Sequence, residues 1–241
     1  MQIPVIRGLI ARRILVNYRV QPDVLARLLP APFRPKLVNG SGMAGVCLIR
    51  LKQLRPKFLP AFIGLSSENA AHRIAVEWGH DGETKEGVFV PRRDTSSRIN
   101  TLLGGRLFPG MHSHAAFQVE EQGDHFRIEL TSDDQRTHLL LDGHVADELP
   151  GNSVFGSLPE ASRFFERGSL GYSVTTRPGQ FDGLELRSFN WRVRPLDVTN
   201  MKSSFFENRE LFPLGSVDFD CALLMQGIDH EWHGRDCLYS G

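Results

Sequence analysis

The sequence predicts an α+β protein dominated by antiparallel sheet, arranged either as a barrel or as a sandwich. Nine segments rich in branched or aromatic residues are bounded by Gly, Pro, Asn or Asp, a pattern typical of strands. Several alternate apolar and polar residues with a period of two, as Phe126, Ile128 and Leu130 do along one segment. Their short and irregular spacing leaves no room for a helix between successive strands, which disfavours a doubly wound parallel sheet.

In chain order, the predicted strands cover residues 13–19, 45–51, 73–78, 86–90, 113–120, 125–131, 170–176, 181–193 and 216–226. Three predicted helices interrupt them. The first begins at Pro22 and places apolar residues at helical spacing. Asp94 is expected to cap the second, whose apolar face extends to residue 107. The third begins near Leu158, just before a proline suited to a first helical turn, and ends at Gly168.

The composition argues against nucleic acid and membranes as partners. The 241 residues include 28 Lys and Arg against 28 Asp and Glu, with a pI near 7.1, so neither sign of charge dominates. A typical domain has roughly 100–200 residues, and nothing divides this chain, so we expect a single domain over residues 1–241. No apolar stretch approaches the roughly 18 residues of a membrane span.

The cysteines and lysines limit the chemistry that the chain can perform. The cysteines are odd in number and scattered, without the spacing of a disulfide framework or zinc site, so we expect a cytoplasmic protein. Lysines are few, which leaves little choice for amine catalysis; they are Lys36, Lys52, Lys57, Lys85 and Lys202. Serine-hydrolase, dinucleotide, Walker and EF-hand motifs do not occur, so we expect no cofactor.

Two groups of side chains are candidates for chemistry. His112 and His114 are two apart, so in an extended segment their imidazoles share one face, where they could begin a metal site or supply a general base. Glu68 and His72 could form an acid/base pair in a cavity, and either could supply a third metal ligand. The alternatives are a solvated strand face for the two histidines and an ordinary polar loop for residues 66–73.

A family resemblance covers most of the chain. Residues 12–33 read as a strand, a short helix and then Leu-Leu-Pro-Ala-Pro-Phe, and this run resembles the opening of acetoacetate-decarboxylase-like proteins. The segment 45–51, a Glu68-Asn69 turn and the Gly-Arg-Leu-Phe step at 105–108 follow in the same order. The chain is most similar to the uncharacterised, YqjF-like bacterial branch of that superfamily, over about residues 10–232.

The resemblance implies a closed, mostly antiparallel β-barrel or cone with a few flanking helices around a small apolar cavity, often in a homo-oligomer. In the decarboxylases, a Pro-Lys-Lys segment supplies the lysine that forms a Schiff base with the substrate. Here the corresponding residues 109–113 read Pro-Gly-Met-His-Ser and offer no amine. Because an imidazole cannot form an iminium, we expect that this protein is not a true decarboxylase.

The resemblance also implies a pocket. Glu68 resembles the family's active-site glutamate, and Arg12 falls within one residue of its pocket arginine. With these, we expect Glu68 and His112 to be catalytic, as in a lyase or isomerase, and Arg12, His72 and His114 to bind a small keto or carboxylate compound. Arg12 and Glu68 could instead be a structural ion pair.

Two further hypotheses remain open at this point. The chain could be a non-catalytic ligand-binding or regulatory barrel that kept the cavity and lost the chemistry. It could also be a metal-dependent enzyme that uses His112 and His114, whereas the lyase or isomerase described above needs no metal.

Overall fold

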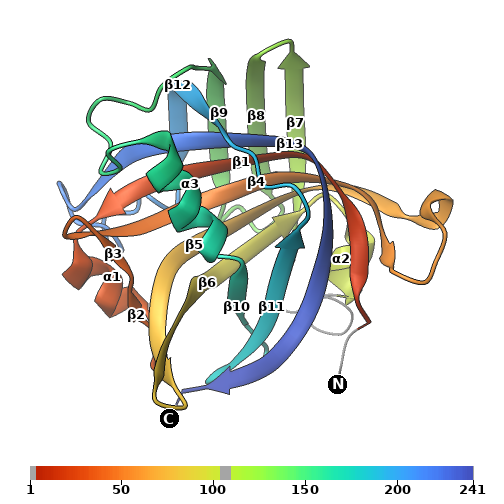
Figure 1. The fold of residues 1–241 in the computed structure, drawn as a ribbon, viewed down its shortest axis with the longest axis horizontal. Coiled ribbons are helices and arrows are strands. Elements are labelled where there is room, and N and C mark those ends of the chain that lie inside the picture. Colours follow the sequence, from red (N-terminus) through yellow and green to blue (C-terminus); the bar gives the residue numbers. More distant parts are fainter. Residues whose placement is uncertain (1–3, 104–109, 241) are drawn as a thin grey trace.

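The computed structural model describes residues 4–103 and 110–240 (Figure 1). Its elements, in chain order, are β1 (Ile6–Val20), α1 (Pro22–Leu28), β2 (Arg34–Pro35), β3 (Leu37–Val38), β4 (Ser41–Pro56), the 3-10 turn η1 (Ala61–Ile63), β5 (Leu65–His80), β6 (Glu83–Thr95), α2 (Arg98–Leu103), β7 (Ser113–Gln122), β8 (His125–Ser132), β9 (His138–Val145), α3 (Leu158–Arg167), β10 (Leu170–Val174), β11 (Gln180–Ser188), β12 (Arg194–Ser203) and β13 (Val217–Tyr239). The predicted sheet-dominated α+β class is confirmed.

Each predicted strand coincides with an observed one, but β9, β12 and the two-residue strands β2 and β3 were not expected. β12 contains Pro195, Asp197 and Asn200, residues that usually mark turns. It is nevertheless a strand because its backbone pairs with β9 along most of its length and with the middle of β13. Tertiary pairing therefore overrides a weak local preference.

Three local expectations were wrong, and two others concern residues outside those that the structure describes. The polar run 66–73 is not a loop, because it lies in β5, where Glu68 pairs opposite Arg50 of β4. Asp94 does not cap a helix but lies within β6, opposite Ala70. The predicted strand 181–193 ends at Ser188. The expected extension of the second helix beyond Leu103 lies outside the described residues, as does the step at 105–108.

The strands form one mixed sheet whose pairings close two circuits (Figure 1). Among the described strands, the pairings are antiparallel except for those of β10 with β6 and of β6 with β7. Pairing of β11 with β13 and of β5 with β6 closes a smaller circuit through β11, β10, β6, β5, β4, β1 and β13. The larger circuit runs through β7, β8, β9 and β12 and shares β13, β1, β4, β5 and β6 with the smaller one.

The shared strands have a circuit on each side, so both of their faces are buried. In β1, Ile14 and Val16 belong to a larger apolar cluster, whereas Leu15 between them belongs to a smaller one. Successive side chains of a strand point to opposite faces. Neighbours in sequence on β1 therefore lie in different interiors, and this decides which side chains can meet in a cavity.

Helices α1 and α3 pack against the two apolar clusters. In α3, the Ser157 hydroxyl accepts a hydrogen bond from the Glu160 N–H at 3.4 Å, which caps the helix. Its buried Ala161 and Phe165 belong to the smaller apolar cluster, while α1 contributes Val24 to the larger one. Within residues 4–103 and 110–240, no helix combines the length and the apolar character needed to cross a bilayer.

Candidate functional site

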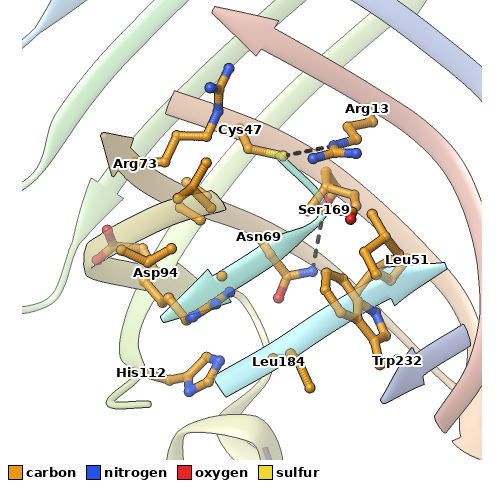
Figure 2. A pocket seen from close by; sticks show the side chains of 18 of the residues that line it. Arg13, Cys47, Leu51, Asn69, Arg73, Asp94, His112, Ser169, Leu184 and Trp232 are labelled. Carbon is orange, nitrogen blue, oxygen red and sulfur yellow. Dashed lines mark hydrogen bonds between the residues drawn. The ribbon is translucent and has the colours of Figure 1, made fainter. Parts of the chain in front are cut away.

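A cavity of about 120 Å³ lies inside the smaller circuit (Figure 2). Strands β1, β4, β5, β6, β10, β11 and β13 all contribute to it, together with the end of α3. Most of its wall is aliphatic, with one indole. The lining residues are Arg13, Cys47, Ile49, Leu51, Leu54, Asn69, Ala70, Ala71, Arg73, Val88, Val90, Arg93, Asp94, His112, Gly168, Ser169, Gly171, Leu184, Leu186 and Trp232.

Three guanidinium groups line this cavity without a carboxylate partner. They come from Arg13 of β1, Arg73 of β5 and Arg93 of β6. Within the described part of the chain, no acidic side chain forms an ion pair with any of them. Their hydrogen bonds go to neutral groups: Arg93 Nε donates to Ser173 Oγ at 3.1 Å, and Arg73 Nη2 donates to Asn17 Oδ1 at 2.5 Å.

Burial makes these charges expensive for the protein. Only 6% of Arg73 is exposed, and its guanidinium lies over the Phe165 ring, 5.0 Å from the centroid. Burial lowers the pKa of Arg73 and that of Arg93 to about 10. Both groups therefore stay protonated at neutral pH. A buried positive charge without a counter-ion costs free energy, and an anion entering the cavity would recover it.

Asp94 is the acidic residue among those that line the cavity, and it is already paired. Arg92 Nη2 lies 2.7 Å from Asp94 Oδ1, and the same guanidinium contacts Asp134 at 2.8 Å. Burial raises the pKa of Asp94, although the hydrogen bond from Arg92 opposes this. Asp94 thus neutralises Arg92 and leaves the three cavity arginines uncompensated.

His112 supplies a neutral imidazole at the wall of the cavity. Its Nδ1 lies 3.2 Å from the Gly110 carbonyl oxygen, which can only accept, so Nδ1 carries the hydrogen and Nε2 keeps a free lone pair. Burial, and then the charge of Arg93, lower the pKa of His112 to about 4. Gly110 has a φ of +85°, and a Cβ there would lie 2.6 Å from the Ser173 Cβ, so a glycine is required at this turn.

The structure places Arg12 and Glu68 away from this cavity, on the opposite face of their strands. Arg12 contacts Glu68 and Glu121 at 2.5 Å each, and only 1% of its side chain is exposed. Arg50 completes the group, because it also pairs with Glu68 and lies 3.1 Å from Glu121. These four side chains form a closed ion-pair network that joins β1, β4, β5 and β7.

His72 and His114 also lie outside the lining. His72 is fully buried, with its ring 4.7 Å from that of Phe205, and burial followed by the charge of Arg92 lowers its pKa to about 3. His114 Nδ1 lies 2.9 Å from Asp133 Oδ2 near the surface. Of the sequence-predicted site residues, His112 alone is among those that line the cavity.

The geometry gives no support to a metal site at these histidines. No group of three or more His, Cys, Asp or Glu side chains within residues 4–103 and 110–240 is arranged to hold a metal ion. All five lysines lie within the described residues, and none of them lines the cavity.

Sequence reasoning missed Arg13, Arg73 and Arg93. Arg12 and Arg13 are adjacent, and the residues around them are apolar on both sides of the strand, so periodicity does not show which one faces a cavity. One usable signal was present: Arg73 directly precedes the apolar run Ile-Ala-Val. A charged residue at the edge of a fully apolar strand indicates either a buried pair or a binding site.

Comparisons with known proteins agree with this architecture. A model of the DUF2071 family, described as an uncharacterised conserved protein, matches residues 10–219. A comparison with curated proteins gave no match.

Solved structures with the same fold include two decarboxylase-like proteins and one biosynthetic enzyme. Acetoacetate decarboxylase from Legionella pneumophila subsp. pneumophila str. Philadelphia 1 has a TM-score of 0.61 and 13% identity, over 97% of this chain and 87% of that one. An acetoacetate decarboxylase-like enzyme from Sphingomonas wittichii RW1 has a TM-score of 0.58 and 13% identity, over 98% and 92%. The enduracididine biosynthesis enzyme MppR, complexed with pyruvate, has a TM-score of 0.59 and 10% identity, over 98% and 90%.

Identities this low establish the fold and not the reaction. The family model, however, covers most of the chain, and the solved structures span nearly all of it. The resemblance seen in the sequence is therefore confirmed: the chain belongs to the DUF2071 family and has the fold of acetoacetate-decarboxylase-like proteins.

Proposed function

We propose that the cavity binds a small organic carboxylate, with a 2-oxo acid as the best-fitting class. The observation that carries this proposal is the set of three guanidiniums, Arg13, Arg73 and Arg93, that line a mainly apolar cavity and form no ion pair with the described acidic side chains. Guanidinium pairs with carboxylate through two parallel, charge-assisted hydrogen bonds. A carboxylate in this cavity would neutralise buried charge that the described side chains leave uncompensated.

The size of the cavity supports a small ligand. A protein cavity of about 150 Å³ accommodates benzene, which has six non-hydrogen atoms. At about 120 Å³, this cavity suits a molecule of similar or slightly smaller size. Pyruvate falls in this range, and the MppR structure with the same fold is a pyruvate complex.

His112 gives the cavity a means of moving a proton. Its neutral imidazole has an unprotonated Nε2, which can accept a proton from the carbon next to a ketone and return it. Arginine beside the carboxylate would hold the substrate during this exchange. The proposal uses no Schiff base and no cofactor, which is consistent with the absence of lysine from the lining residues.

The three cysteines bear on the cellular location. All three are free thiols; Cys47 and Cys221 are buried, and Cys237 is half-buried. Free thiols persist in reducing compartments, which supports placing the protein in the cytoplasm.

Matched acid and amide ligands test the binding proposal. We expect pyruvate to raise the Tm of the protein in a concentration-dependent way, whereas pyruvamide, which has the same shape and no charge, leaves it unchanged. Arg93→Met should weaken pyruvate binding by about 10- to 100-fold, because one charge-assisted interaction is lost. Arg127→Met, on the exposed face of β8, is the control and should bind pyruvate as the native protein does. Equal Tm shifts from pyruvate and pyruvamide would contradict an anion site.

Proton exchange distinguishes an enzyme from a binding protein. In D₂O we expect the native protein to accelerate deuterium incorporation at the methyl group of pyruvate, measured by NMR. His112→Asn should keep the pyruvate-dependent Tm shift and lower this exchange by about 10²- to 10⁴-fold, the usual contribution of a general base. Undiminished exchange in His112→Asn removes His112 from the mechanism. Binding without exchange in the native protein favours the non-catalytic barrel.

A further inference from the structure

The three cysteines differ in the charge of their neighbours. Cys47 lines the cavity and is 6% exposed, and its Sγ accepts a hydrogen bond from Arg13 Nε at 3.2 Å (Figure 2). Cys237 instead faces a carboxylate, since its Sγ donates to Asp182 Oδ1 at 3.4 Å. For Cys221, burial and then the charge of Asp220 raise the pKa of the thiol. Of these three thiols, only Cys47 lines the cavity and accepts a hydrogen bond from a cationic side chain.

A second observation in the same cavity points to a missing anion. Arg73 is more than nine-tenths buried, and its Nε has no hydrogen-bond partner within the described residues. The sulfur of Cys47 accepts a hydrogen bond from one of the three guanidiniums that line this cavity, and cationic neighbours of this kind stabilise a thiolate.

A neighbouring hollow borders the cavity that Cys47 lines. A groove of about 240 Å³ shares Arg13, Ser169 and Leu186 with the cavity. Its other lining residues include Arg187, half of whose side chain is exposed. Arg13 thus stands where the groove and the cavity meet.

We propose that Cys47 is a nucleophilic thiolate that bonds to the electrophilic carbon of a small carboxylate held by the same arginines. The carboxylate part rests on the proposed function, whereas the thiolate part rests on the contacts of Cys47 itself. With iodoacetate as the probe, the Cys47 proton leaves to solvent and the sulfur attacks the methylene carbon. The C–S bond forms as the C–I bond breaks, and iodide departs with the bonding electron pair.

The test compares alkylation rates of individual cysteines in the native protein by peptide mass spectrometry. We expect iodoacetate at neutral pH to modify Cys47 at least about tenfold faster than Cys237, the less buried internal control, because the thiolate is the reactive form. Relative to glutathione, Cys47 should also prefer the anionic iodoacetate over the neutral iodoacetamide. Arg13→Gln should slow modification of Cys47 by about tenfold and leave Cys237 unaffected.

The outcomes separate the two proposals. If Cys47 reacts no faster than Cys237 with either reagent, or if Arg13→Gln leaves its rate unchanged, the thiolate is overturned even where pyruvate still raises the Tm. If Cys47 reacts quickly with both reagents but shows no preference for iodoacetate and no protection by pyruvate, the thiolate stands and the carboxylate site fails. The comparison of two reagents in the native protein keeps the test valid should Arg13→Gln fold poorly.

Discussion

Replacing Arg12 with methionine is expected to lower the free energy of unfolding by about 3–5 kcal/mol, the usual cost of breaking a buried ion pair by removing one partner. Arg12 is almost fully buried and bridges Glu68 and Glu121 at 2.5 Å each. Without its guanidinium, the two carboxylates share the single charge of Arg50, which is partly exposed. Burying the apolar methionine adds some stability, but less than the lost ion pairs contributed, because the remaining carboxylates stay desolvated without their partner.

Guanidinium-chloride unfolding measures this effect. Arg127→Met is again the control, since Arg127 also bridges two carboxylates, Glu129 and Asp142, but its side chain is 35% exposed against 1% for Arg12, and ion pairs that reach solvent contribute little. The structural role assigned to Arg12 is contradicted if both variants lose the same stability. We also expect Arg12→Met to bind pyruvate normally at a temperature where it is folded, because Arg12 does not line the cavity.

Stability is expected to fall steeply as the pH drops from about 6.5 to about 5, because three histidines are buried in their neutral form. Burial and a nearby arginine lower the pKa of His72 to about 3 and the pKa values of His112 and His230 to about 4. The unfolded chain binds these protons near the ordinary pKa of 6.5, whereas the folded chain does not. The unfolded state therefore gains free energy as the pH falls, and stability decreases by up to about 1.4 kcal/mol per pH unit for each histidine.

Urea unfolding between pH 6.5 and pH 5 gives the slope directly, above the range in which most carboxylates titrate. The slope of the unfolding free energy against pH reports how many more protons the unfolded chain binds than the folded chain, and this number should approach three near pH 5. His72→Leu should lower it by about one. His144→Leu, at a largely exposed histidine, is the matched control for the loss of an imidazole. An unaltered slope in His72→Leu would show that His72 is protonated in the folded protein.

The fold could be predicted from local sequence signals. Alternation in β8 and the turn-forming residues between segments are enough to indicate an antiparallel sheet. The strand β12 could not be foreseen, because Pro195 and Asp197 disfavour a strand locally and only pairing with β9 holds it. Closure of the two circuits depends on pairings between strands far apart in sequence, and no local pattern records these.

The site was harder to predict, for a physical reason visible in β1. Sequence reasoning could identify strands that carry arginine, but not which face of each strand meets a cavity. When both faces are apolar, a shift of one residue exchanges Arg12 with Arg13 and leaves the pattern unchanged. His112 was predicted from its spacing with His114 and from its place in the segment that corresponds to the decarboxylases' lysine motif, neither of which depends on knowing which face of the strand meets a cavity.

A crystal structure of the protein soaked with 2-oxobutyrate tests the central claim most directly. The account predicts density inside the smaller circuit, with the carboxylate oxygens within about 3 Å of at least two of Arg13, Arg73 and Arg93 and the ketone facing His112. A 2-oxobutyrate molecule bound outside this cavity, or a cavity that stays free of carboxylate at saturating concentration, would contradict it.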